Sequence, residues 1–247
     1  DIGQMKIGRR LAIKLLNATK FALAIGREDE NHHVGAPAVA AWNPADVTEP
    51  IDRSAMSKMA AVVREATDDL NNYEHSKALE VIENYFWQFC DDYIELVKNR
   101  AYGTADSTGN VPSEAAVKSA RTTLGLGLDA FARLLAPYLP YATEEVWSWM
   151  HEGEGSVHRA AWPVADVYAA GDASADLLAH AGEALAALRG IKSKAKVSMK
   201  TPILSVTLAV ADDVRGSIEA ALGDIAEAGR VTGPIAFTAP AAAEGED

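Results

Sequence analysis

The chain has 247 residues, of which 49% are hydrophobic and 7% aromatic, and its formal net charge is −12. A protein that coats nucleic acid nonspecifically would be basic over most of its surface, so this balance excludes that class. The single cysteine, Cys90, excludes an internal disulfide framework and a Cys-based zinc cluster. The sequence has no apolar run of about 18 residues and no signal-peptide pattern, so we expect a soluble, cytoplasmic protein without a membrane partner.

Positive charge gathers at the N-terminus. Residues 2–27 carry six basic and no acidic side chains, which leaves a net charge of −18 for the rest of the chain. A short basic segment on an acidic protein indicates one local polyanionic partner. The six basic residues are Lys6, Arg9, Arg10, Lys14, Lys20 and Arg27.

Helical spacing of apolar residues organises the first 150 positions. From Met5, apolar residues that include Ile7 and Ile13 recur at this spacing and predict a helix of about twenty residues. A polar, Gly- and Pro-rich loop follows. Three further helices are predicted, one after Pro50, a long one from near Ser76, and one opened by residues 112–113.

Composition changes after a short fifth helix, for which the Thr143 hydroxyl is the expected N-cap. The segment SVHRAAWP indicates an extended segment or a strand. Helix and strand patterns then alternate twice, which is typical of a small α/β unit. Lys192, Lys194, Lys196 and Lys200 form a second basic stretch, which we interpret as a solvated turn.

These patterns predict a mainly α protein with two domains. We expect a helical bundle at residues 1–151, an extended linker at 152–171 and a small α/β domain at 172–240. Residues 241–247 have nothing to bury and are expected to be disordered.

Motifs for catalysis or metal binding are weak. Gly125 and Gly127 loosely resemble a dinucleotide-binding loop, but they lie inside a helical pattern, so close helix packing is favoured. His32 and His33 are neighbours on an acidic loop, and without a third ligand they make a poor chelate. Cys90 lies in an apolar run and is expected to be a buried thiol. We therefore assign no catalytic residue and no metal site.

The basic helix is the strongest candidate for a binding surface. On an ideal helix, at about 100° per residue, its cations lie roughly on one side, with Lys14 nearby and Asn17 adjoining. Such cations can replace the counterions of a phosphate backbone, and Phe21 beside them could stack on a base. A solvated helix face, paired with acids elsewhere on the protein, explains the charge equally well.

Four segments occur in the order in which similar segments occur in class I aminoacyl-tRNA synthetases, beyond the catalytic domain. They are KIGRRLAIKLLNATKFAL, FWQFCDDYIELVKNRAYG, LLAPYLPYATEEVWSWM and SVHRAAWP. The resemblance covers residues 3–163 well and the α/β unit more weakly. The last two segments resemble valyl, isoleucyl and leucyl enzymes alike, whereas NATKFAL and FCDDYIELVK favour the C-terminal region of bacterial valyl-tRNA synthetases.

This resemblance implies a helical anticodon-binding domain that holds the anticodon arm of a tRNA for a catalytic domain of the same, monomeric polypeptide. ATP and Mg²⁺ would serve that catalytic domain, and no cofactor is implied here. Arg and Lys would neutralise phosphates, Asn17 would bond a base edge or sugar, and Phe21 would stack. With Lys6 added from the charge pattern, the expected tRNA-binding residues are Lys6, Arg9, Arg10, Lys14, Asn17, Lys20 and Phe21.

Two departures limit this expectation. The HIGH-type and KMSKS-type signatures are absent, so the chain, which begins without Met, is expected to be a C-terminal piece that cannot aminoacylate alone. The chain ends in AAAEGED, so we expect that the basic coiled-coil arm that ends many valyl enzymes is missing or was removed. Two alternatives remain, namely the same region of an isoleucyl or leucyl enzyme and a freestanding helical interaction module.

Overall fold

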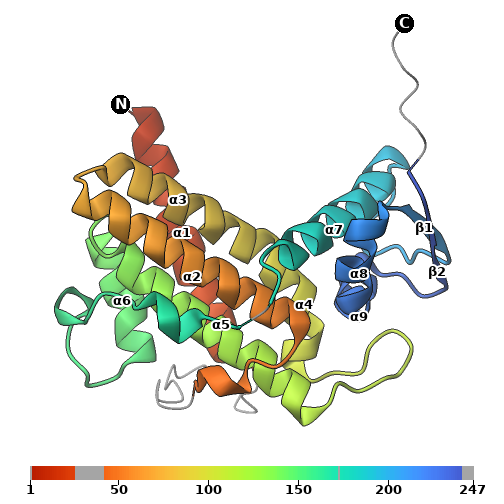
Figure 1. Cartoon of the computed structure of the whole chain (residues 1–247), viewed down its shortest axis with the longest axis horizontal. Helices are drawn as coiled ribbons and strands as arrows, with labels where there is room; N and C mark the ends of the chain where they lie inside the picture. Colours follow the sequence, from red (N-terminus) through yellow and green to blue (C-terminus); the bar gives the residue numbers. More distant parts are fainter. Residues whose placement is uncertain (1, 26–41, 172, 241–247) are drawn as a thin grey trace, which may run out of the picture.

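A computed structural model describes residues 2–25, 42–171 and 173–240. Its first part is a helical bundle, in which α1 passes behind α2 and α3 in the view of Figure 1. The predicted mainly α fold is confirmed. The elements of the bundle are α1 (Ile2–Ala24), η2 (Pro44–Asp46), α2 (Pro50–Asn71), α3 (His75–Gln88), η3 (Phe89–Tyr93), α4 (Ile94–Tyr102), α5 (Glu114–Leu135) and α6 (Pro140–Met150).

Aromatic side chains from α3, η3 and α5 form the centre of the bundle. The Phe131 ring centre lies 5.1 Å from that of Phe86 and 5.4 Å from that of Phe89, at interplanar angles of 79° and 64°. All three side chains are fully buried. Edge-to-face pairs of this kind add to the stabilisation that their buried area provides. The core therefore holds α5 firmly against the long α3–α4 helix.

Two glycines allow α5 to approach its neighbours closely, as the sequence indicated. A β-carbon on Gly127 would lie 2.6 Å from the Phe89 ring, and one on Gly125 would lie 2.1 Å from the Trp42 ring. Both distances are far shorter than a van der Waals contact, so the glycines serve packing.

The long helix contains one π-helical turn, η3, between α3 and α4. Cys90 lies in this turn and is buried, as the sequence predicted. Burial raises the pKa of the Cys90 thiol to about 12, so it is almost entirely protonated at neutral pH.

Two local predictions in the region after α5 are wrong. Helix α6 begins at Pro140, a residue well suited to the first helical position, and not after Thr143. The Thr143 hydroxyl instead donates to the carbonyl of Leu139 at 2.9 Å. The segment SVHRAAWP forms the 3₁₀ turn η4 (Val157–Arg159) in place of a strand, because the Ser156 hydroxyl caps it.

The connection between the bundle and the C-terminal elements packs on the bundle. The indole N–H of Trp162 donates to the Thr67 hydroxyl of α2 at 2.9 Å. A second 3₁₀ turn, η5 (Ala165–Tyr168), places the Tyr168 hydroxyl 3.0 Å from the Arg133 guanidinium, which donates to it. These contacts hold the connection in irregular turns.

The remaining elements, which we call the C-terminal unit, lie to the right of the bundle in Figure 1. They are α7 (Asp176–Lys194), β1 (Val206–Ala209), α8 (Asp212–Ala220), α9 (Leu222–Gly229) and β2 (Ile235–Thr238). The two strands pair in parallel, with Val206 opposite Ile235. The single helix expected between the strands is divided into α8 and α9. Lys192 is buried and donates to the carbonyls of Met199 and Gly229, so the expectation that it is solvated is wrong.

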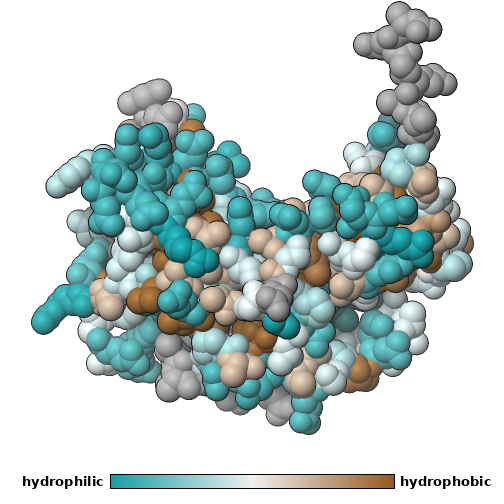
Figure 2. Space-filling model, viewed as in Figure 1, coloured by the Kyte–Doolittle hydropathy of each residue, from teal (hydrophilic) through white to brown (hydrophobic). Residues whose placement is uncertain are grey.

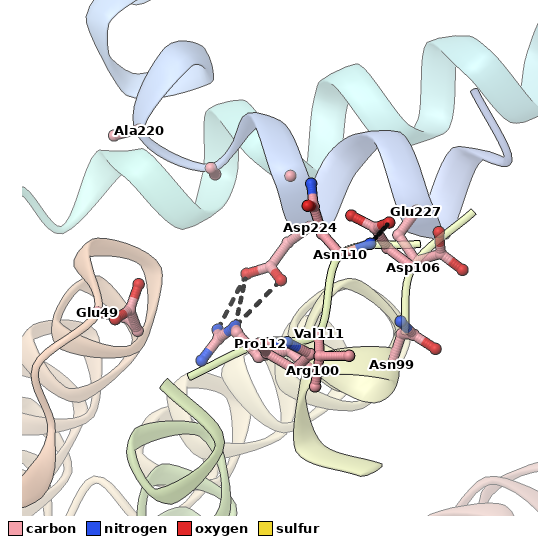
Figure 3. A pocket seen from close by; sticks show the side chains of 12 residues that line it. Glu49, Asn99, Arg100, Asp106, Asn110, Val111, Pro112, Ala220, Asp224 and Glu227 are labelled. Carbon is pink, nitrogen blue, oxygen red and sulfur yellow. Dashed lines mark hydrogen bonds and ion pairs between the residues drawn. The ribbon is translucent and has the colours of Figure 1, made fainter. Parts of the chain in front are cut away.

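A buried ion-pair network, which we call the Arg100 network, joins the C-terminal unit to the bundle (Figure 3). The Arg100 guanidinium of α4 donates to Asp52 of α2 at 2.8 Å and to Asp224 of α9 at 2.9 Å. Asp52 also accepts from the Tyr93 and Ser119 hydroxyls at 2.8 and 2.6 Å. Figure 2 shows hydrophilic surface on both parts, with a hollow between them. The network therefore fixes how the two parts meet.

Candidate nucleic-acid interface

Helix α1 buries one stripe and exposes the opposite one. Leu11 and Leu15 are buried where α1 packs on α5 and α6. Ile7 and Ile13, which the apolar pattern includes, are each 45% exposed. Ile13 lies two residues after Leu11 and so faces almost the opposite way. The N-terminal end of α1 projects past the bundle (Figure 1).

Four cations on this exposed stripe form no ion pair with any residue that the structure describes. Lys6, Arg9, Arg10 and Lys20 are all exposed. Exposed cations without carboxylate partners keep their full charge available to an anion. We call this surface the α1 cationic face, made of Lys6, Arg9, Arg10, Lys14, Asn17, Lys20 and Phe21.

Tryptophans from two other helices flank the α1 cationic face. The Arg10 guanidinium lies 5.9 Å from the centre of the Trp87 ring of α3. Further along α1, the Lys20 ammonium lies 5.2 Å from the centre of the Trp149 ring of α6. These cation–π contacts leave the positive charge unneutralised while orienting both side chains.

Lys14 differs from the other cations of the face. Its ammonium donates to Asp91 of η3 at 2.7 Å. Partial burial disfavours its charge, but the hydrogen bond and the negative charge of Asp91 outweigh this and raise the pKa of Lys14. An incoming phosphate would compete with Asp91 for this ammonium, so Lys14 offers less to an anion than Arg9 does.

Asn17 and Phe21 lie further along the same helix. Asn17 is exposed, so its amide can donate and accept hydrogen bonds. Phe21 is half-buried, and its ring meets the edge of the Tyr102 ring at a centroid distance of 5.9 Å. The Lys98 ammonium lies 5.3 Å from the Phe21 ring centre. The structure thus adds two side chains of α4 to this end of the face.

Sequence reasoning missed the tryptophans and α4 residues as parts of this surface. Trp87 and Trp149 are each only half-buried, and the indole N–H of each donates to a glutamate of its own helix. One available signal was the neighbour Phe86, which is fully buried and so turns Trp87 away from the centre. Lys98 and Tyr102 carried no comparable signal, because their nearness to Phe21 depends on tertiary packing.

The remaining sequence candidates add no residue to the α1 cationic face within the part of the chain that the structure describes. Arg27, His32 and His33 lie outside the described residues. Within residues 2–25, 42–171 and 173–240, no group of three or more His, Cys, Asp or Glu side chains could hold a metal ion. The helices in these ranges include none long and apolar enough to cross a membrane. The arrangement on α1 suits recognition of an anionic, aromatic polymer.

Comparison with known proteins also indicates an RNA-binding chain. A family described as the anticodon-binding domain of tRNA ligase matches residues 52–208. Valine–tRNA ligase of Bifidobacterium longum subsp. infantis is 77% identical over 246 residues, which are 99% of this chain and 27% of that protein. The same-named protein of Salinispora tropica is 47% identical over 224 residues, 84% of this chain and 24% of its own length.

A third relative, valine–tRNA ligase of Thermobifida fusca, is 44% identical over 234 residues, 94% of this chain and 24% of its own. The chain thus spans about a quarter of the length of the curated relatives it matches. The family match includes α2 to α7 and reaches β1, and the relatives extend the similarity across α1. The chain belongs to the family of anticodon-binding domains of tRNA ligases.

Proposed function

We propose that this chain is the anticodon-binding region of a valine–tRNA ligase and that the α1 cationic face holds the anticodon arm. One observation carries the assignment of the surface. Four exposed cations of α1 have no carboxylate partner among the described residues, although the chain as a whole is strongly acidic. The relatives that match almost the whole chain bear the name valine–tRNA ligase.

The roles of the side chains follow from their chemistry. Lys6, Arg9, Arg10 and Lys20 neutralise phosphates, with Arg able to donate two parallel hydrogen bonds. Asn17 bonds a base edge or a sugar, and Phe21 stacks on a base after its contact with Lys98 is rearranged. Lys14 contributes after exchanging Asp91 for a phosphate.

The rest of the enzyme is assigned to segments outside this chain. We propose that activation of valine with ATP and Mg²⁺ takes place in a catalytic domain of the same polypeptide, and that the enzyme is a cytoplasmic monomer. In this chain, the bundle covers residues 1–151, the connection 152–171 and the C-terminal unit 172–240. Binding here then supplies affinity and tRNA choice, while the chemistry takes place elsewhere.

Competition binding tests the function. The 247-residue chain is mixed with a labelled valine tRNA anticodon stem-loop, and unlabelled tRNA or an unrelated acidic protein is added. We expect valine tRNA to displace the label at lower concentration than isoleucine or leucine tRNA does, and the acidic protein to displace none. Equal displacement by the acidic protein would favour a protein-interaction module, and preference for isoleucine or leucine tRNA would reassign the enzyme.

A further inference from the structure

A second positively charged surface lies between α4 and the C-terminal unit. It is a groove of about 310 Å³ that opens beside α9. Five cations line it against two carboxylates, Glu95 and Glu227, in a chain whose net charge is −12. We call it the α4–α9 groove, and its cations are Lys98, Arg189, Lys192, Lys200 and Arg230.

Most of this charge is uncompensated. Lys98, Lys200 and Arg230 are exposed and form no ion pair with any residue in the described ranges. Arg189 meets Glu95 at 3.5 Å, with both side chains about 40% exposed, so this pair is weak and open to exchange. Glu227 is already engaged, because it accepts a hydrogen bond from the backbone N–H of Ser107 at 2.9 Å.

The floor of the groove is a buried ammonium. Lys192 is 4% exposed and donates to the carbonyls of Met199 and Gly229 at 3.0 and 2.9 Å. Burial and the nearby charge of Arg230 both lower the pKa of Lys192. Two cations therefore approach each other here, and an anion placed in the groove would relieve their repulsion.

The groove is continuous with the α1 cationic face. Lys98 and Tyr102 line the groove, and both also contact the Phe21 ring of α1. The two surfaces therefore meet at Phe21, so a single RNA strand bound along α1 can continue into the groove. The volume is at the lower end of the about 300–1,000 Å³ typical of small-ligand sites, which suits one nucleotide and excludes a duplex.

We propose that the α4–α9 groove binds the phosphate and sugar of an unpaired anticodon-loop nucleotide, so that the C-terminal unit completes the tRNA interface. This inference rests on the function proposed above. Proteins recognise RNA sequence mainly in loops, where bases can leave the stack and their phosphates become accessible from several sides. Arg189, Lys200 and Arg230 hold the phosphate, and Tyr102 borders the base.

A loop-specific loss of affinity tests the groove. The variant Lys200→Ala with Arg230→Ala is titrated, as the 247-residue chain, against two labelled RNAs, the valine anticodon stem-loop and the same stem closed by a tight four-nucleotide loop. Alanine keeps the β-carbon of Arg230, whose φ of 55° is therefore no more strained than before. Lys58→Ala with Lys194→Ala is the matched control, since both lysines are exposed and lie outside the groove.

We expect the groove variant to bind the anticodon stem-loop about tenfold more weakly and the closed stem less than about twofold more weakly. The slope of log affinity against log salt should fall by about 1.4, as two lost contacts to a single strand require. Affinity equal to that of the control variant would overturn the inference, and so would an equal loss on both RNAs. If Arg9→Ala with Arg10→Ala weakens binding of the stem-loop and the groove variant does not, only the inference about the groove fails. If neither variant changes the affinity, or if the unaltered chain does not bind the RNA, the proposed function fails as well.

Discussion

Arginines serve opposite purposes in two regions of the molecule. In the Arg100 network, one guanidinium is 10% exposed and is shared by Asp52 and Asp224. On the α1 cationic face, Arg9 and Arg10 are exposed and meet no carboxylate among the described residues. The first arrangement leaves no positive charge for a ligand, whereas the second leaves nearly all of it.

These two arrangements explain how an acidic protein can hold a polyanion at one place. Buried pairs cost desolvation that must be recovered by several hydrogen bonds, as Arg100 recovers it from two carboxylates and the Ala116 carbonyl. Exposed cations avoid that desolvation cost, and their positive charge remains free to attract an anionic ligand. Changes in the network should therefore alter folding stability, and changes on α1 should alter binding.

Removal of Arg100 should give the largest effect. Arg100→Ala leaves Asp52 buried without its cation, and we expect the free energy of unfolding to fall by about 3–5 kcal/mol. Denaturant unfolding measures it. Lys77→Ala, which removes an exposed pair with Glu74, should cost less than about 1 kcal/mol. A loss at Arg100 as small as that at Lys77 would mean that the network does not hold the two parts together.

A side chain added at Gly127 should have the second-largest effect on stability. A methyl group there would meet the Phe89 ring at 2.6 Å, so Gly127→Ala should lower the free energy of unfolding by about 1–3 kcal/mol. Gly190→Ala in α7 meets nothing within 4 Å and should raise stability by up to about 1 kcal/mol. Thermal unfolding of the two variants gives the comparison, and equal shifts would contradict the packing argument.

The ring of Phe21 should matter for RNA and little for folding. Phe21→Leu keeps a half-buried apolar side chain but removes the stacking surface, so affinity for the anticodon stem-loop should fall about tenfold. The matched control is Phe237→Leu, since Phe237 is also half-buried beneath a cation, Arg215, at 4.9 Å. Fluorescence anisotropy measures the affinity of both variants for the stem-loop. Similar losses of affinity in the two variants would show that Phe21 is not part of the interface.

Releasing Lys14 from its ion pair should have the smallest effect, and it should raise the affinity for RNA where the other changes lower affinity or stability. Asp91→Asn removes the carboxylate that holds the Lys14 ammonium at 2.7 Å, so affinity for the stem-loop should rise about two- to threefold. Asp68→Asn on α2 removes one exposed negative charge far from α1 in sequence and serves as the control. An identical rise in the control would show that only net charge matters.

The helices were predictable where local pattern decides them. Pro50 and Ser113 mark the starts of α2 and α5, and apolar spacing identifies the long helix that contains η3. The start of α6 was misplaced because Pro140 is equally compatible with ending a turn and opening a helix. The segment around Val157 was expected to be extended or a strand, and its 3₁₀ turn was missed because the cap, Ser156, gives only a local signal.

The site was predictable only in part. The cations of α1 follow from sequence because a helix fixes which of its own residues share a face. The Arg100 network does not, since Asp224 lies 124 residues from Arg100. Nor does the buried position of Lys192, which depends on the carbonyls of Met199 and Gly229 being brought together by folding. Contacts between distant residues require the tertiary structure.

Arg9 and Arg10 of α1, which meet no carboxylate among the described residues, are proposed to contact tRNA phosphates. The direct measurement is affinity for the valine anticodon stem-loop across a salt series, for the unaltered chain and for Arg9→Ala with Arg10→Ala. We expect about 30-fold weaker binding near 0.1 M salt, a slope of log affinity against log salt smaller by about 1.5, and unchanged unfolding. Lys58→Ala with Lys194→Ala, which removes the same charge elsewhere, should change affinity less than about twofold. Unchanged affinity and slope in the α1 variant would show that these arginines do not contact the phosphates.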